Sequence, residues 1–184
     1  PNADQMFHEN YAFFSGTSSY MQKHFAGFAK QVQEKYLTGD DPFIVEIGSN
    51  DGIMLQNFAK ANIRHLGIEP SKNVAQVAID KGINTITEFF NEDCAKLIVK
   101  KHGQADAFVA ANVMCHIPPI HTIVKGIKTL LKPSGIAQFE DPYLGDVLEK
   151  VSYDQIYDEH TFLFSANSID FLFGMYDMEL INVE

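Results

Sequence analysis

The sequence predicts an α/β fold, in which a mostly parallel sheet carries helices on both of its faces. From residue 43 onward, short β-like runs alternate with helical segments at intervals of about 20–25 residues, as in folds built from strand–helix–strand units. The chain has 184 residues, of which 46% are hydrophobic, so it can bury one substantial core. We therefore expect one domain, which consists of a helical N-terminal segment (1–41), an α/β core that binds a ligand (42–141), and a segment that ends in the last strand (142–184).

The first helix is predicted over residues 19–36, where apolar residues recur at helical spacing. The apolar stripe consists of Met21, Phe25, Phe28, Val32 and Tyr36. Ser19 with Gln22 gives this helix a capping box at its start, and Gly39 gives it a stop after its end.

The strands are predicted from six short apolar runs that are bounded by polar or turn residues. They cover residues 43–48, 65–70, 83–87, 106–112, 135–141 and 178–184. Because most of them are separated by a helical stretch, consecutive strands are expected to run in the same direction.

The helices between these strands are marked by capping residues. Ser71 caps one helix that Gly82 ends, and Asn91 caps the next. Residues 118–135 give another helix with proline at its start and Pro-Ser-Gly at its end, and residues 145–153 give a short one. The helix after Asn91 has charges that complement its dipole, with acids at Glu92 and Asp93 and basic residues at Lys100, Lys101 and His102.

Composition argues against several classes of protein. The net charge of −10 does not suit a nucleic-acid surface, and no apolar run approaches the roughly 20 residues of a membrane span. Cys94 and Cys115 form no CxxC pair, which argues against a metal site or a disulfide framework and favours a reducing cytoplasm. Since the chain starts at Pro1 and its last predicted strand reaches Glu184, we expect a piece of a longer protein, cut at both ends.

The loop after the first predicted strand, VEIGSNDG, lies where an open parallel sheet binds its ligand. Gly48 allows the backbone to approach a ligand closely, and Asn50, Asp51 and Gly52 suit a tight turn before a helix. The loop lacks the GxGxxG spacing of a dinucleotide-binding fold, which makes a dehydrogenase the weakest alternative.

A second signal is the acid that closes the second predicted strand. Glu69 lies 21 residues after Gly48 and is followed by Pro70. A carboxylate in this place can accept hydrogen bonds from both hydroxyls of a ribose. The alternative without a binding role is that the glycines only make a turn and that Glu69 is a surface acid.

The two signals together resemble the class I S-adenosylmethionine-dependent methyltransferases, which share an acid-x-Gly-x-x-x-Gly loop, here with Glu46 as its acid. This resemblance implies a Rossmann-like class I methyltransferase fold with S-adenosylmethionine as the cofactor. It implies that the loop from Gly48 to Gly52 lies against the methionine part, that Glu69 holds the ribose, and that Asn112 faces the cofactor. The pair Phe89–Phe90 either flanks the adenine or belongs to the core.

Three further stretches narrow the resemblance to the sugar C-methyltransferases. These stretches are FHENYAFFSGTSSYMQKHF before the sheet, NVMCHIP after the fourth strand, and YDQIYDEHTFLFS after the fifth. Proteins of this family methylate carbon 3 of a nucleotide-linked 4-keto-6-deoxy hexose, and they have an N-terminal zinc-binding segment and a C-terminal domain that this chain does not show. The resemblance implies a small-molecule substrate and neither nucleic-acid nor membrane partners; the sequence indicates no particular oligomeric state.

Methyl transfer to carbon requires a base, because the proton next to a ketone must first be removed. Histidine has a pKa near neutrality, and His160 is the candidate base, with Glu159 beside it to stabilise the imidazolium or to bind substrate. The negative charge that develops on the ketone oxygen needs hydrogen-bond donors, and the family pattern suggests Tyr157, Tyr11 and His116 for this role.

Alternatives remain open for these residues. Each Tyr or His can be a half-buried structural anchor, and Glu159 can be a solvated acid. A methyltransferase that acts on a hydroxyl group would use His160 to deprotonate oxygen. A degenerate domain that binds S-adenosylmethionine or a protein partner without chemistry is the alternative from outside the enzymes.

Overall fold

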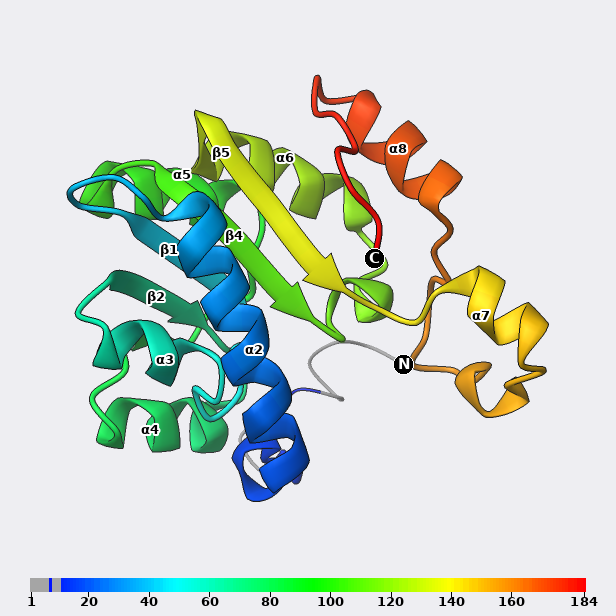
Figure 1. Ribbon diagram of the computed structural model, residues 1–184, viewed down its shortest axis with the longest axis horizontal. Coiled ribbons are helices and arrows are strands. Elements are labelled where there is room, and N and C mark those ends of the chain that lie inside the picture. Colours follow the sequence, from blue (N-terminus) through cyan, green and yellow to red (C-terminus); the bar gives the residue numbers. More distant parts are fainter. Residues whose placement is uncertain (1–6, 8–10) are drawn as a thin grey trace.

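The computed structural model of this protein describes residue 7 and residues 11–184. Five strands form one sheet in the order β3-β2-β1-β4-β5, and all neighbouring pairs are parallel (Figure 1). The strands are β1 (Phe43–Ile47), β2 (Arg64–Ile68), β3 (Thr85–Ile86), β4 (Ala105–Ala111) and β5 (Leu131–Glu140). The predicted α/β fold with a parallel sheet is therefore confirmed.

Helices cover both faces of the sheet (Figure 1). The α-helices are α2 (Ser19–Tyr36), α3 (Leu55–Lys60), α4 (Lys72–Asp80), α5 (Glu92–His102), α6 (Ile120–Leu130), α7 (Leu144–Glu149) and α8 (Ala166–Gly174). Three single turns of 3₁₀-helix are η1 (Ser15–Thr17), η2 (Met114–His116) and η3 (Tyr153–Gln155). The helix expected over residues 145–153 is thus shorter than predicted, because the chain turns after Glu149.

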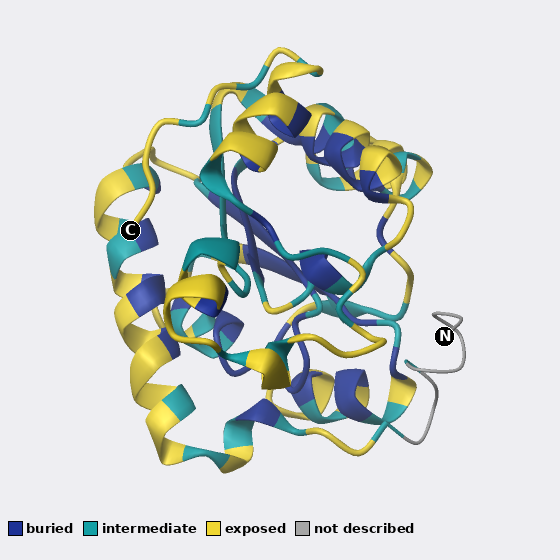
Figure 2. Ribbon diagram, turned by 90° about the vertical axis from the view of Figure 1, so that its right-hand side faces the viewer, coloured by how far each residue is buried: buried dark blue, intermediate teal, exposed yellow. Residues whose placement is uncertain are grey.

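Two apolar clusters form the core, one on each face of the sheet. Helices α2 and α3 pack on the face that carries Ile44 and Val109, whereas α5, α6 and α8 pack on the face that carries Val45 and Phe108. Consecutive residues of β1 thus point to opposite faces, and both are buried because helices cover both sides. Figure 2 shows the buried strands inside and the exposed outer faces of the helices around them.

The helix ends follow the predicted capping residues in part. The Asn91 side chain accepts a hydrogen bond from Cys94 N at 2.9 Å, and Gly82 follows α4 with a left-handed φ of 79°. Helix α2 has the predicted bounds, but its N-cap is Ser18, whose side chain accepts from Met21 N. Ser19 already lies in the first turn of the helix, so the capping box expected from Ser19 and Gln22 is wrong.

Strand β5 begins earlier than predicted. Leu131 already pairs with Ala105, so the Pro-Ser-Gly expected to end a helix lies inside the strand. The register shifts between Ala105 and Ala107, which indicates a bulge in this pair. A bulge accommodates Pro133, because proline has no N–H group to offer to the ladder.

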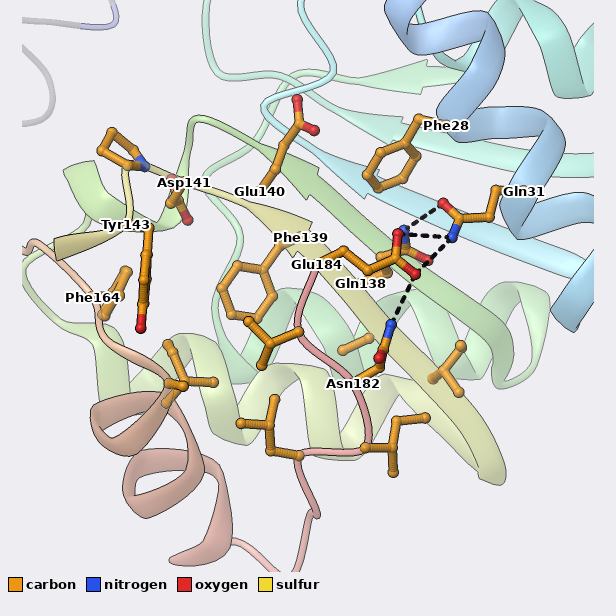
Figure 3. A pocket seen from close by; sticks show the side chains of 18 of the residues that line it. Phe28, Gln31, Gln138, Phe139, Glu140, Asp141, Tyr143, Phe164, Asn182 and Glu184 are labelled. Carbon is orange, nitrogen blue, oxygen red and sulfur yellow. Dashed lines mark hydrogen bonds between the residues drawn. The ribbon is translucent and has the colours of Figure 1, made fainter. Parts of the chain in front are cut away.

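The strand expected over residues 178–184 is wrong. Those residues cross the open side of β5 without main-chain pairing and end near α2, where Gln31 donates to the Glu184 carboxylate at 3.3 Å (Figure 3). Met178 and Leu180 pack against the core, whereas Ile181 is exposed. The alternation of apolar and polar residues correctly indicated that one side of this segment is buried. An extended segment can bury one side without forming the hydrogen bonds of a strand.

Among the described residues, no helix combines the length and the apolar character that crossing a membrane requires.

Truncation of Phe108 tests the packing of this core. The side chain is 0% exposed on β4 and lies 5.7 Å from Phe90 between ring centroids. Phe108→Ala is expected to lower the free energy of unfolding by about 3–5 kcal/mol, measured by urea denaturation of the full-length protein. Phe171→Ala is the matched control, because Phe171 is 74% exposed on α8. Its effect is expected to stay within about 0.5 kcal/mol. Equal losses in the two variants would contradict this account of the core.

Candidate active site

A cavity of about 830 Å³ opens at the carboxyl ends of the strands. The strand order reverses between β1 and β4, and open parallel sheets bind ligands at such a point. The ends of β1, β2 and β4 supply one wall, and residues from before the sheet and from the segment after β5 supply another. The fold thereby brings together parts of the chain that are far apart in sequence.

The loop after β1 approaches the cavity closely because Gly48 has no side chain. Gly48 has a left-handed φ of 58°, and a Cβ atom at this position would collide with Val113. Its N–H donates to Ile68 O at 2.8 Å, which fixes the loop to the end of β2. The loop can therefore present its main chain to a ligand without reshaping.

Glu69 is held by two main-chain donors. Asn50 N donates to one carboxylate oxygen at 3.0 Å and Ser71 N donates to the other at 2.8 Å. Burial raises the pKa of Glu69, and these hydrogen bonds oppose that effect. Each oxygen keeps a free lone pair, so the carboxylate can accept two further hydrogen bonds from a ligand diol in the cavity.

Two more of the residues predicted from the sequence lie at this cavity. Pro70 lines the cavity, and so does Asn112, whose N–H donates to Glu140 O at 2.7 Å and whose φ is 55°. Phe89 and Phe90 both line the cavity, and Phe90 also packs in the core, whereas Phe89 is partly exposed.

Glu46 is a buried acid behind the cavity. One of its oxygens has no hydrogen-bond partner among the described residues. Burial, together with the charges of Glu69 and Asp51, raises the pKa of Glu46 well above its ordinary range. An unpaired buried oxygen next to a loop that admits a ligand fits a site built for a polar group.

The segment after β5 brings Tyr157 next to His160. The Tyr157 hydroxyl lies 3.0 Å from His160 Nε2, and His160 Nδ1 lies 2.8 Å from Gln155 O. A carbonyl oxygen only accepts, so Nδ1 carries the proton and the Nε2 lone pair of the neutral ring accepts from the Tyr157 hydroxyl. The imidazole is therefore oriented with its basic nitrogen toward Tyr157.

His116 joins this group from the turn after β4. Its Nδ1 lies 2.9 Å from Glu159 O, and its ring centroid lies 4.9 Å from that of His160. By the same argument, Nδ1 of His116 carries a proton and donates it in a hydrogen bond to the carbonyl oxygen of Glu159. Main-chain oxygens thus fix the orientation of both imidazoles.

Tyr11 reaches the same region from before the sheet. Burial and the charges of Glu69 and Glu159 raise the pKa of Tyr11, and burial followed by the Glu159 charge raises the pKa of Tyr157. Both phenols therefore keep their protons at neutral pH and can donate hydrogen bonds.

Cys115 and Asp141 were not predicted from the sequence, although Cys115 directly precedes His116. Cys115, His116 and His160 offer donor atoms that all lie within 4.8 Å of one another. Burial, followed by the Asp141 charge, raises the pKa of the Cys115 thiol. The thiol therefore keeps its proton in the metal-free protein.

The predicted site residues thus fall into two groups. Those that line the cavity are Tyr11, Gly48, Asn50, Glu69, Pro70, Asn112, His116, Tyr157, Glu159 and His160. Those that do not line it are Glu46, Asp51 and Gly52. The loop therefore meets the cavity through only part of its length.

A second and larger cavity, of about 1010 Å³, lies beside β5 (Figure 3). It is lined by α2, by the open side of β5 and by residues 180–184, and it contains none of the predicted site residues. For that reason the first cavity, although smaller, is the candidate active site.

Comparison with known proteins agrees with this geometry. Residues 20–183 match the family described as "Methyltransferase domain". The chain is 31% identical over 174 residues to the C-methyltransferase NovU of Streptomyces niveus, an alignment that covers 95% of this chain and 41% of the relative. It is 26% identical over 95 residues to a ubiquinone biosynthesis O-methyltransferase of Acinetobacter baylyi, which covers 50% of this chain and 40% of that protein. The chain thus spans about two fifths of the length of these curated relatives.

Solved structures share the fold at low sequence identity. The magnesium protoporphyrin IX methyltransferase ChlM of Synechocystis PCC 6803, solved with bound S-adenosylhomocysteine, superimposes with a TM-score of 0.63 at 15% identity. The match covers 88% of this chain and 74% of that one.

The raised pKa of Glu46 makes stability depend on pH. The folded protein holds this proton more tightly than the unfolded chain, so the stabilisation is complete below the ordinary pKa of 4.5 and is lost as the pH rises through the raised value. Within that window, wild-type stability is expected to fall by up to about 1.4 kcal/mol per pH unit. Urea unfolding should therefore show Glu46→Gln to be more stable than the wild type near neutrality but not in acid. Glu149→Gln, an exposed control on α7, should show no such crossover. If the free energy of unfolding of Glu46→Gln and of the wild type changed in parallel with pH, burial would not raise the pKa of Glu46.

Loss of the Glu69 carboxylate should weaken cofactor binding. Glu69→Ala is expected to cost about 1.5–3 kcal/mol of affinity for S-adenosylhomocysteine, the range for hydrogen bonds to a charged group. Calorimetric titration of the full-length protein measures this, with Glu149→Ala as the control. An unchanged affinity in Glu69→Ala would take Glu69 out of the cofactor site.

Proposed function

Because this chain belongs to the methyltransferase family and S-adenosylmethionine is its cofactor, we propose that it transfers a methyl group to carbon 3 of a nucleotide-linked 4-keto-6-deoxy sugar. The observation that carries this proposal is the pair Tyr157–His160, in which the basic nitrogen Nε2 of His160 accepts a hydrogen bond from a phenol 3.0 Å away. A base beside a hydrogen-bond donor is the arrangement that formation of an enolate requires. The 31% identity to NovU, a C-methyltransferase, supports carbon as the methyl acceptor.

In the proposed reaction, the Tyr157 hydroxyl turns from His160 Nε2 to the ketone oxygen of the bound substrate, and Nε2 takes the proton from the carbon next to the ketone. The electrons of that C–H bond move to the ketone oxygen, which becomes an enolate. With a proton on Nε2, the His160 ring becomes a positively charged imidazolium, and its Nδ1–H group continues to donate to Gln155 O. The carboxylate of Glu159 lines the same cavity and favours this positive charge.

Three donors are available for the enolate oxygen. Tyr157 and Tyr11 both keep their hydroxyl protons, and His116 can donate from Nε2 once it is protonated. The cofactor supplies an electrophilic methyl group on a positively charged sulfur. The chain contributes position, because Glu69, the Gly48 loop and His160 line one cavity, which can hold cofactor and acceptor together.

The charges of the cavity limit which part of the acceptor it holds. Its described lining residues include five acids and neither lysine nor arginine. The acids are Glu69, Glu88, Glu92, Asp93 and Glu159. A diphosphate would be repelled here, so we place only the sugar ring inside the cavity and the nucleotide beyond its mouth. A substrate of this kind is consistent with the cytoplasmic location that we also propose.

Methyl transfer to a hydroxyl group is the second candidate. The match to a ubiquinone biosynthesis O-methyltransferase over 50% of the chain favours it, although that match covers fewer residues at lower identity. In that reaction His160 would remove a proton from oxygen, and no carbon-bound proton would exchange. Proton exchange at carbon therefore separates the two reactions.

Deuterium uptake tests the proposal directly. The full-length protein is incubated in heavy water with S-adenosylhomocysteine and a 4-keto-6-deoxy sugar nucleotide, and NMR follows the proton on carbon 3. We expect exchange in the wild type and a loss of about 10²–10⁴-fold in His160→Gln, because the side-chain base is removed.

His121→Gln serves as the matched control, since His121 lies on α6, outside the cavity, with Nδ1 2.8 Å from the Tyr176 hydroxyl. No exchange in the wild type, with S-adenosylhomocysteine shown to be bound, would reject carbon as the acceptor. Near-normal exchange in His160→Gln would reject His160 as the base.

A further inference from the structure

The Asn50 side chain holds the chain that precedes the sheet. Its Oδ1 accepts from Ser15 N at 2.9 Å, and its Nδ2 donates to Phe13 O at 3.0 Å. These two bonds resemble the pairing of a strand, with one amide side chain in place of a main-chain neighbour. We call residues 13–16 the strap.

The Asp51 side chain holds the end of the strap. Gly16 N lies 3.1 and 3.2 Å from the two carboxylate oxygens, and Lys81 Nζ lies 3.2 Å from one of them. Asp51 is 4% exposed, so this carboxylate depends on these partners for its stability. A Cβ atom on Gly16 would collide with the carboxylate, which shows how closely the strap approaches the loop.

The strap carries residues into the cavity. Phe13 and Ser15 line it, and Tyr11 enters it two residues before the strap. The main chain of Tyr11 is tied to α4, because Asn73 Nδ2 donates to Tyr11 O at 2.8 Å. Tyr11 thereby shares the cavity with Glu69 and Glu159, and after burial the charges of both carboxylates raise the pKa of its phenol.

We propose that Asn50 and Asp51 are positioning residues, which hold the strap so that the Tyr11 hydroxyl stands between the cofactor and the methyl acceptor. The role of Tyr11 as a donor rests on the proposed function, whereas the attachment of the strap does not. The loop then has two tasks on two sides: its main chain faces the cofactor, and its side chains fix a wall of the acceptor site.

The test compares Asn50→Ala and Asp51→Ala with the wild type in the full-length protein. Hydrogen exchange followed by mass spectrometry reports on the strap amides of Ser15 and Gly16, and calorimetry gives the affinity for S-adenosylhomocysteine. We expect exchange at the strap to be at least about tenfold faster, affinity to change by less than about threefold, and methyl transfer to fall about 10–100-fold.

Two further variants sharpen the test. Asp41→Ala is the matched control, because Asp41 is exposed and pairs with Arg64 at the opposite end of the strands. Gly16→Ala displaces the strap from its own side, which provides a second route if Asp51→Ala does not fold. The double variant Tyr11→Phe/Asp51→Ala should be less than about threefold slower in methyl transfer than Tyr11→Phe alone, because the effect of Asp51 passes through Tyr11.

Several outcomes would overturn the proposal. Affinity for S-adenosylhomocysteine that falls in step with turnover, with strap exchange unchanged, would make both side chains cofactor contacts. Effects of Asp51→Ala and Tyr11→Phe that multiply fully would indicate general destabilisation instead of positioning. A wild type without activity on any keto sugar would reject the proposed function, and strap exchange would still decide whether the two side chains hold the strap.

Discussion

The paired main-chain hydrogen bonds to the Glu69 carboxylate are the constraint on which the site depends. They join the turn after β1, through Asn50 N, to the start of α4, through Ser71 N. A buried carboxylate needs such donors, and these donors in turn fix the spacing between two strand ends. Everything that faces the cavity from the cofactor side is built on that spacing. The strap is attached to the same turn, so the position of the acceptor side also depends on the spacing between these two strand ends.

Local sequence signals predicted the fold because each of them has a local cause. The alternation of strands and helices, the Asn91 cap and the bounds of α2 all depend on residues that are near one another in sequence. The loop at Gly48 and the acid at Glu69 were found for the same reason. Tyr157 and His160 are three residues apart, so their contact also follows from local geometry.

Features that depend on distant contacts could not be predicted in this way. The direction of the Asn50 and Asp51 side chains is decided by main-chain groups 35 residues earlier or more, which no local pattern encodes. Whether residues 178–184 pair with β5 depends on the path of the chain after α8, since the same alternation serves a packed but unpaired segment. The position of Pro133 inside β5 depends on a bulge opposite Ala105.

The five carboxylates around the cavity have a consequence for the order of events in a catalytic cycle. The methyl donor carries one more positive charge than the demethylated product, because the sulfur loses its charge when the methyl group leaves. An acidic cavity attracts the charged form more strongly, so it favours the loaded cofactor over the spent one. In the proposed reaction, long-range charge would thereby weaken product inhibition, without any contact that distinguishes the two molecules. Added salt screens such charges, and the advantage of the loaded cofactor therefore shrinks as ionic strength rises.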